Sequence, residues 1–233
     1  MILEVARGNP TDGTRMVAAL SSRELGRAVN RKKARRLMTE HRLLQRHRPL
    51  GRRQRPRFFR IERPDQLWHM DMISVWSAEH GWSYLNAIID CCTREITGWS
   101  LDVRCRQQEA TAVLEQAVTD RRIEPGALVL SSDNGTAYTS RAFRARLTEL
   151  GVTHRRGGYR DPESQAFIES WFPKLKERCI WREEFETLDD AREAISRYID
   201  RYHHRPHSRL AYKTPREVAA LWQHPDDQLI PAA

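Results

Sequence analysis

The chain has 233 residues, with 40 Lys and Arg against 31 Asp and Glu and a formal net charge of +9 at pH 7. This length allows one catalytic domain of ordinary size and a small additional unit. No apolar run approaches the roughly 20 residues that a membrane-spanning helix needs, and the N-terminal residues lack the layout of a secretory signal. The four cysteines form no C-x-x-C pair, which disfavours a zinc site or a disulfide framework. We therefore expect a cytoplasmic protein with reduced thiols and no membrane partner.

Positive charge is concentrated near the N-terminus. Residues 23–60 contain 15 Lys or Arg and two acidic residues, a net charge of +13. The remainder of the chain therefore sums to 9 − 13 = −4. A block of like charge this dense is typical of a segment that binds nucleic acid. A solubilising segment is the alternative interpretation.

Residues 1–45 are predicted to be a helical DNA-binding segment, because apolar residues between Thr14 and Leu44 recur at helical spacing opposite a basic face. The basic side chains expected to contact DNA there are Arg31, Lys32, Lys33, Arg35 and Arg36. Residues 46–64 are predicted to be a basic linker, since Pro49, Gly51 and Pro56 interrupt regular structure. Its phosphate-contacting residues are expected to be Arg52, Arg53, Arg55 and Arg57.

Residues 65–185 are predicted to form the catalytic core. Three strand-like segments, 67–76, 82–90 and 95–103, are joined by short polar turns and indicate an antiparallel meander. Helical and strand patterns then alternate, with helices at 107–122, 140–150, 163–180 and 189–202 and short strands at 128–130 and 151–154. This order predicts an α/β fold with a mixed sheet and helices on both faces. Residues 186–233 are expected to hold the last helix and a basic, irregular tail.

Three carboxylates occur in settings that suit a metal-dependent phosphoryl-transfer site. Asp71 lies inside a strand-like run, Asp133 follows an apolar run and precedes an Asn-Gly turn, and Glu169 lies on a predicted helix. Two Mg²⁺ (or Mn²⁺) ions about 3.5–4 Å apart stabilise both oxygens of an in-line displacement, and such ions prefer hard oxygen ligands. We expect Asp71 to bridge the two ions and the others to complete one shell each. Without metal, repulsion among the three carboxylates should raise the pKa of one or more of them or push the side chains apart.

Several other residues could contribute to such a site or have an ordinary structural role. Lys176 follows Glu169 by seven residues, so both share a helix face; we expect it to contact a DNA phosphate, with an ordinary surface lysine as the alternative. Asp161 and Glu163 suit helix capping, and Asp90 suits a turn. Tyr138 fits either the site or the core. Residues interpreted as core or packed near the sheet are His154, Trp68, Trp82, Trp99, Trp171 and Trp181.

Five motifs, in order, resemble those of insertion-sequence transposases with a retroviral-integrase-like core. They are W-H-M-D at 68–71, D-C-C-T-R-E-I-T-G-W at 90–99, S-D-N-G-T-A-Y-T-S at 132–140, Q-A-F-I-E-S-W-F at 165–172 followed by Leu175-Lys176, and a closing set of Tyr202, Arg205, His207, Leu210 and Thr214-Pro215. More narrowly, residues 13–218 are similar to the second-reading-frame product of the family named after insertion sequence three. Two positions depart from the family: Pro173 replaces a usual glycine, and Arg178 a usual glutamate.

The resemblance implies an RNase H-like fold with Asp71, Asp133 and Glu169 as the catalytic and metal-binding residues. It implies Mg²⁺-dependent DNA strand cleavage and strand transfer at the ends of a mobile element, by a copy-out, paste-in route. The implied partners are the terminal inverted repeats, target DNA, further copies of the chain and an upstream-frame product, in a bacterial, nucleoid-associated setting. Pro173 is expected to kink the glutamate helix. Two alternatives stay open: a catalytically inactive DNA-binding remnant or repressor, and a nuclease that cuts without joining.

Overall fold

The computed structural model describes residues 1–44, 61–156 and 166–223. These residues fall into two compact units. The smaller unit takes its described residues from Met1–Arg55 and Arg205–Thr214, and the larger from Pro56–His204 and Pro215–Ala233. Among the residues described, no helix has both the length and the apolar character that crossing a bilayer requires.

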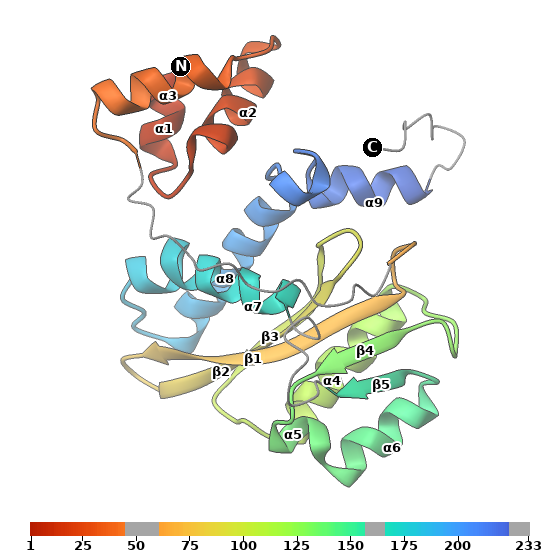
Figure 1. The fold of residues 1–233 in the computed structure, drawn as a ribbon. Coiled ribbons are helices and arrows are strands. Elements are labelled where there is room, and N and C mark those ends of the chain that lie inside the picture. The colour runs from red at the N-terminus through yellow and green to blue at the C-terminus, as the bar shows by residue number, and fades with distance from the viewer. Residues whose placement is uncertain (45–60, 157–165, 224–233) are drawn as a thin grey trace. The chain divides into compact units, whose positions relative to one another are not determined.

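The larger unit is built on a five-stranded mixed sheet in the order β3-β2-β1-β4-β5 (Figure 1). The strands are β1 (Leu67–Ser77), β2 (Gly81–Asp90), β3 (Ile96–Asp102), β4 (Val129–Ser132) and β5 (Thr153–Arg156). The first three pair antiparallel, and β4 pairs parallel with both β1 and β5. The predicted meander and mixed sheet are confirmed, and β1 occupies the centre.

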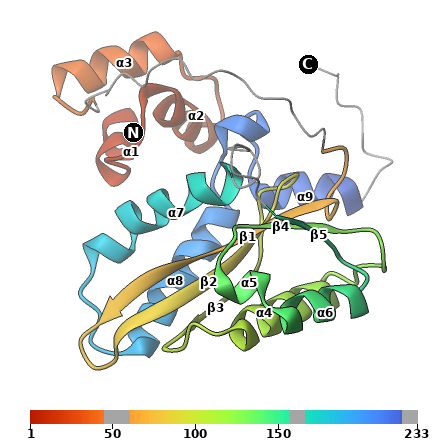
Figure 2. The same ribbon diagram turned by 60° about the horizontal axis from the view of Figure 1, so that its bottom comes forward.

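Helices cover both faces of this sheet, as predicted (Figure 2). On one face lie α4 (Gln107–Asp120), α5 (Thr136–Thr139) and α6 (Arg141–Glu149); on the other lie α7 (Ala166–Arg178) and α8 (Leu188–His203). Alternate side chains of a strand point to opposite faces. Trp68 and Met70 of β1 therefore pack with α4 and α6, whereas Val75 packs with α7 and α8.

The prediction of an irregular tail after residue 202 was wrong. The short 3-10 helix η2 (Ser208–Leu210) and the helix α9 (Pro215–Gln223) follow α8, and another 3-10 turn, η1 (Ile180–Arg182), lies between α7 and α8. Proline favours the first position of a helix because its missing N–H has no partner there, so the Thr-Pro pair marks the start of α9. Arg216 of α9 forms an ion pair of 3.1 Å with Glu95, whose side chain is buried.

A buried charge cluster holds the beginning of β1 and the turn between β2 and β3. Arg121 pairs with Asp65 at 3.1 Å and with Glu95 at 2.9 Å, and approaches Asp90 at 3.7 Å. The Asp90 carboxylate accepts N–H groups from Asp65, Cys92 and Thr93 at 2.6–3.0 Å. Its pKa is nevertheless raised to about 6, because burial outweighs these bonds. The prediction that Asp90 is a turn residue is confirmed.

Two tryptophans expected in the core are exposed. Trp68 and Trp171 are buried and Trp99 is half-buried against the core, as predicted. Trp82 and Trp181, however, have 58% and 72% of their surface exposed, so that prediction was wrong for both. Trp82 lies opposite Trp76 near the tip of the β1–β2 hairpin, where the two rings meet edge to face at 5.3 Å.

The smaller unit consists of α1 (Ile2–Gly8), α2 (Thr14–Leu25) and α3 (Arg31–Glu40). The region from Thr14 to Leu44 was predicted to hold two or three short helices, and it holds two, α2 and α3; α1 was not predicted. The start of α3 is capped by Asn30, whose side chain accepts the N–H of Lys32 at 2.8 Å. Residues of the closing motif complete this unit: Arg205 donates to Asn9 at 2.9 Å and also to the buried carboxylate of Asp12.

Replacing Arg205 by Met is expected to destabilise the smaller unit by about 3 kcal/mol, because a buried carboxylate loses its cationic partner. Hydrogen exchange of the α2 amides in the full chain would measure the loss. Replacing Asp12 by Asn in the Arg205→Met background should recover most of it, since no unpaired charge then remains. Unchanged exchange in Arg205→Met would contradict a stabilising role for this pair.

Candidate active site

The first carboxylate, Asp71, lies in the middle of the central strand and is half-buried. It shares a strand face with His69 and Val75, the face that α7 covers. Its Oδ1 atom accepts the N–H of Met72 at 2.7 Å. The central position of β1 therefore places this group on a rigid element next to both β4 and α7.

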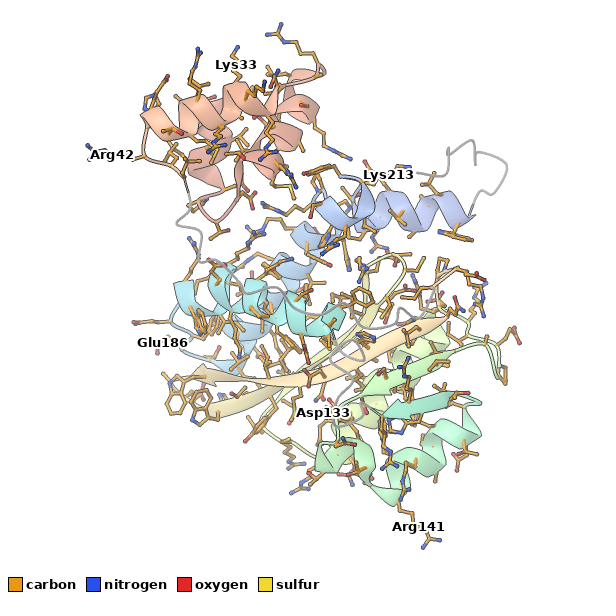
Figure 3. The ribbon with its side chains drawn as sticks, in the orientation of Figure 1. Lys33, Arg42, Asp133, Arg141, Glu186 and Lys213 are labelled. Atoms are coloured by element: carbon orange, nitrogen blue, oxygen red, sulfur yellow. The ribbon has the colours of Figure 1, made fainter. Side chains whose placement is uncertain are left out.

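Asp133 is brought beside Asp71 by the parallel pairing of β1 and β4. The register places Met70 opposite Ser132, so Asp71 and Asp133 are the next residues along neighbouring strands. Such strands lie about 4.8 Å apart. Asp133 is exposed where β4 ends, as Figure 3 shows, and its Oδ1 atom accepts the Gly135 N–H at 2.8 Å. The predicted Asn-Gly turn thus holds the carboxylate at the strand end.

Glu169 projects from the first described turns of α7 and is exposed. Its helix is fixed to the sheet by a buried face of Ile168, Trp171, Phe172 and Leu175. Lys176 is half-buried on the face it shares with Glu169. Pro173 lies inside the helix on its exposed side, and α7 continues on both sides of it. Pro173 has no N–H to donate to the carbonyl of Glu169.

The electrostatics of Asp71 link these four side chains. Its pKa is raised from 3.8 to about 6, chiefly because burial disfavours the carboxylate and additionally because Asp133 and Glu169 are negatively charged. The Met72 N–H and the charge of Lys176 act in the opposite direction. A raised pKa was expected from repulsion among the carboxylates; burial is the larger cause. The arrangement concentrates negative potential at Asp71, which a bound cation would relieve.

Three polar residues lie near the site: Asn86 on β2, His154 on β5 and Tyr138 on α5. The Tyr138 hydroxyl donates to the side-chain oxygen Oδ1 of Asn86 at 3.3 Å, and both residues are buried. The pKa of Tyr138 is raised by burial and by the charges of Asp71 and Asp133, so Tyr138 both lies near the site and packs in the core. His154 is part of β5, packs against Phe143 of α6, and has its Nε2 atom 2.9 Å from the Ser132 hydroxyl. Asn86 was not predicted, although an amide inside the apolar run of β2 was a signal.

The donor chemistry fits Mg²⁺ or Mn²⁺, since all three candidate ligands offer carboxylate oxygens. Among the residues that the structure describes, no three His, Cys, Asp or Glu side chains lie close enough together to hold a metal ion. The carboxylates come from three separate elements, and those of Asp133 and Glu169 are exposed. Binding an ion with all three would therefore require these two side chains to turn toward Asp71.

The predicted DNA-binding residues of α3 share its solvent-facing side. Arg31, Lys32, Lys33, Arg35 and Arg36 are exposed, whereas Ala34 and Met38 are buried. Figure 3 labels Lys33 on this helix. Arg36 forms an exposed ion pair with Glu40 at 3.6 Å. The predicted linker arginines Arg52, Arg53, Arg55 and Arg57 lie outside the described residues, as do Asp161 and Glu163.

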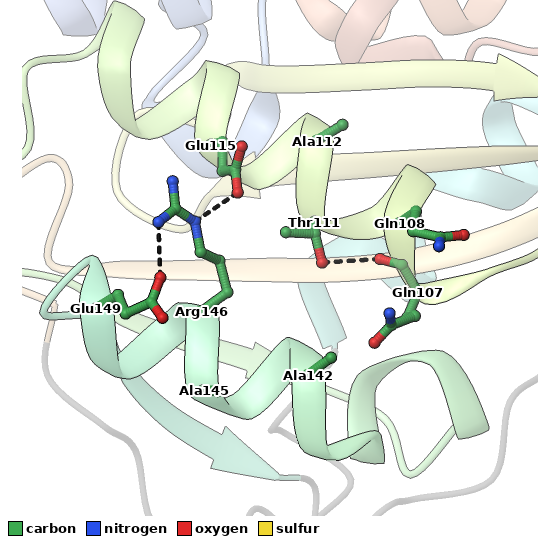
Figure 4. A pocket seen from close by; sticks show the side chains of 9 residues that line it. All are labelled: Gln107, Gln108, Thr111, Ala112, Glu115, Ala142, Ala145, Arg146 and Glu149. Atoms are coloured by element: carbon green, nitrogen blue, oxygen red, sulfur yellow. Dashed lines mark hydrogen bonds and ion pairs between the residues drawn. The ribbon is translucent and has the colours of Figure 1, made fainter.

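A groove of about 430 Å³ between α4 and α6 lies apart from these carboxylates. Arg146 spans it, pairing with Glu115 at 2.5 Å and with Glu149 at 2.7 Å (Figure 4). The rest of its wall is formed by Gln107, Gln108, Thr111 and Ala112 of α4 and by Ala142 and Ala145 of α6. The groove contains none of the candidate ligands.

Comparisons with known proteins agree with this geometry. Models of the integrase core domain match residues 61–162 and 150–215. The transposase for insertion sequence element IS904 of Lactococcus lactis is 32% identical over 161 residues, 68% of this chain and 63% of that protein. Transposase InsF for insertion sequence IS3A of Escherichia coli K12 is 31% identical over 137 residues, 59% of this chain and 47% of that protein. The HTLV-2 integrase catalytic core domain, solved in complex with magnesium in a dimeric form, is 17% identical, with a TM-score of 0.50 over 66% of this chain and 96% of that one.

The sheet, its flanking helices and these matches define an RNase H-like integrase core. The chain belongs to the insertion-sequence transposases of the family named after insertion sequence three. It spans from about half to just under two thirds of the length of these two relatives.

Proposed function

We propose that the chain is a DNA transposase that binds the ends of its mobile element and catalyses metal-dependent strand cleavage and strand transfer. The observation that carries this proposal is the position of Asp71 on the central strand, where the β1–β4 register brings Asp133 beside it and where the charges of Asp133, Glu169 and Lys176 all act on its pKa. Burial, neighbouring charge and position in the fold all favour a functional site here. Its relatives are named as transposases of insertion sequences.

Each residue then has a stated task. Asp71, Asp133 and Glu169 would hold two Mg²⁺ or Mn²⁺ ions, which when bound stabilise charge on the attacking and leaving oxygens of the phosphodiester. Asp71 would be the central ligand of this set, because β1 pairs with β4 and its Asp71 face is covered by α7. Lys176 binds a DNA phosphate beside the carboxylates and so orients the strand that is cut. The same site serves first water and then a DNA 3′-hydroxyl as nucleophile, with no covalent protein–DNA intermediate.

In this proposal the smaller unit binds DNA and the larger unit carries out catalysis. The exposed basic side of α3 contacts the phosphates of the element ends, and the larger unit performs the chemistry. We further propose that copies of the chain assemble on paired ends, with the upstream-frame product as a second partner. The HTLV-2 core, solved in a dimeric form, supports assembly by analogy of fold alone.

The test is an incubation of purified protein with Mg²⁺ or Mn²⁺ and labelled DNA that carries the element's own ends. We expect joined products that need both the metal and the end sequence. Cut but unjoined DNA would favour the plain nuclease. Binding without cleavage by a folded protein would favour the inactive remnant or repressor, or show that the chain needs its upstream partner.

Replacing Arg31, Lys32, Lys33, Arg35 and Arg36 by alanine should flatten the salt dependence of DNA binding. Each lost phosphate contact reduces the slope of log K against log salt by about 0.9, so five contacts correspond to a change of about 4.5. Binding titrations at several salt concentrations would measure it. Alanine at Arg197 and Arg201, exposed on α8, is the matched control and should leave the slope unchanged. An equal effect of both replacements would contradict a DNA-binding role specific to α3.

A further inference from the structure

The ring of Phe167 joins the helix that carries Glu169 to the strand that carries Asp71. Phe167 precedes Glu169 by two residues on α7, and its ring stacks on the imidazole of His69 with centroids 5.2 Å apart and planes 26° apart. His69 precedes Asp71 by two residues on β1 and is buried. Each ring therefore belongs to a residue two positions before a candidate metal ligand in the same helix or strand.

Arg94 is the third member of this group, which we call the Phe167 cluster (His69, Arg94 and Phe167). Its guanidinium carbon lies 3.3 Å from the centroid of the Phe167 ring. Arg94 belongs to the turn between β2 and β3 and has a φ of 67°, a left-handed conformation that glycine adopts more readily than arginine. In the part of the chain that is described, its buried Nε atom has no hydrogen-bond partner. The aromatic face is thus a principal contact of this cation.

Packing alone does not account for these residue types. Phe167 is only half-buried, and an aliphatic side chain would fill much of the same volume. Burying a guanidinium is unfavourable, and here it lowers the pKa of Arg94. Unlike an aliphatic side chain, the aromatic ring of Phe167 is held in one orientation by its contacts, because stacking and cation–π contacts both depend on the direction of the ring face.

The beginning of α7 has a specific need for such orientation. Pro173 cannot donate a hydrogen bond to the carbonyl of Glu169, so the turn that follows Glu169 lacks one of its helical bonds. Ile168 and Trp171 bury the inner face of this turn, and apolar contact is not directional. A second, directional attachment next to Glu169 would therefore fix the helix against rotation.

We infer that Phe167 is a positioning residue that, held by His69 and Arg94, sets the placement of Glu169 relative to Asp71. The inference rests on the proposed metal-binding role of these carboxylates. It also gives the Arg94 of the 90–99 motif and the Phe167 of the 165–172 motif one shared task. Phe167 itself contacts neither metal nor DNA in this account and acts only through Glu169.

The test is the affinity of the purified full chain for Mn²⁺ without DNA, measured by calorimetry. Phe167→Leu should weaken binding by about tenfold, as expected for loss of a residue that orients a metal ligand. Glu169→Gln should weaken it at least as much. The double variant should bind no more weakly than Glu169→Gln alone, because Phe167 acts through Glu169. Phe167→Tyr keeps both ring faces and should bind within about twofold of the original chain.

The matched control is Phe172→Leu, which removes a buried aromatic ring from the same helix outside the Phe167 cluster. It should lower the melting temperature and leave Mn²⁺ affinity unchanged. Arg94→Gln tests the cluster from the turn, without altering α7, and should also weaken binding only while Glu169 is present. This variant decides the question if Phe167→Leu does not fold.

Two results would overturn the inference. One is unchanged Mn²⁺ affinity in folded Phe167→Leu or, where that variant does not fold, in Arg94→Gln. The other is a double variant that loses a further tenfold relative to Glu169→Gln, since the two residues would then act independently. If Glu169→Gln itself binds Mn²⁺ normally, the proposed metal site fails, whatever Phe167 does.

Discussion

Replacing Glu169 by Gln is expected to reduce strand cleavage and joining by about a thousandfold or more, while DNA affinity stays within about twofold. The change removes a metal-binding charge and keeps the size of the side chain. A lost ligand that costs about 4 kcal/mol of transition-state stabilisation corresponds to this factor. Glu169 is exposed, so the substitution should leave stability nearly unchanged. Single-turnover cleavage of labelled element ends and a binding titration would measure the two effects.

Glu177→Gln is the matched control for this experiment. Glu177 is exposed on the same helix, beyond Lys176, and has no proposed part in the chemistry. Its replacement should leave cleavage and joining unchanged. Near-normal turnover in Glu169→Gln would remove this residue from the site, and an equal loss in both variants would point to a general effect of charge on α7.

Much of the fold follows from patterns that act locally. Three strand-like segments joined by short polar turns predicted the antiparallel meander, because antiparallel strands can be joined by a tight turn whereas parallel strands need a long crossover. The Asn134-Gly135 pair favours a turn, so the local sequence was enough to place Asp133 at a strand end. The parallel register of Met70 with Ser132 was not predictable in the same way, since it depends on contacts between segments about 60 residues apart.

The mistaken expectations share a physical cause. Trp82 and Trp181 were assigned to the core on residue type alone, and the structure exposes both. Exposure depends on which segments happen to cover a surface, and a large apolar residue does not specify this. The helix α9 was missed because the segment after Tyr202 looks basic and irregular. Its stability comes in part from a distant ion pair between Arg216 and Glu95.

In the candidate site, too, some features follow from the local sequence and others depend on contacts between distant segments. Residue type and setting in the sequence singled out Asp71, Asp133 and Glu169 as candidate ligands, a prediction that stays open, and helical periodicity placed Lys176 on the face of Glu169. It could not indicate the contacts of His69 and Arg94 with Phe167, which join three elements far apart in the chain. Nor could it show that burial, more than repulsion, raises the pKa of Asp71.

Replacing Asp71 by Asn is expected to abolish catalysis and yet stabilise the metal-free protein at pH 7. The pKa of Asp71 is raised from 3.8 to about 6 in the folded protein. Between these values the folded state binds a proton more readily than the unfolded state, so the free energy of unfolding falls as pH rises through this window. Above pH 6 the cost of the buried charge is fully present, on the order of 1–3 kcal/mol. Asparagine removes this cost, and its oxygen can still accept the Met72 N–H.

Thermal unfolding in EDTA would measure this effect. At pH 7 the melting temperature of Asp71→Asn should exceed that of the original chain by roughly 3–10 °C, and the difference should shrink toward zero near pH 4, where both forms are neutral. Asp102→Asn is the matched control: Asp102 is a half-buried strand aspartate that accepts the N–H of Arg104 at 2.9 Å. Added Mg²⁺ should stabilise the original chain and not Asp71→Asn, because the ion binds the folded state through this carboxylate. If Asp71→Asn melts at a lower temperature than the original chain at pH 7, or if the difference in melting temperature does not depend on pH, then the charge of Asp71 does not destabilise the metal-free protein.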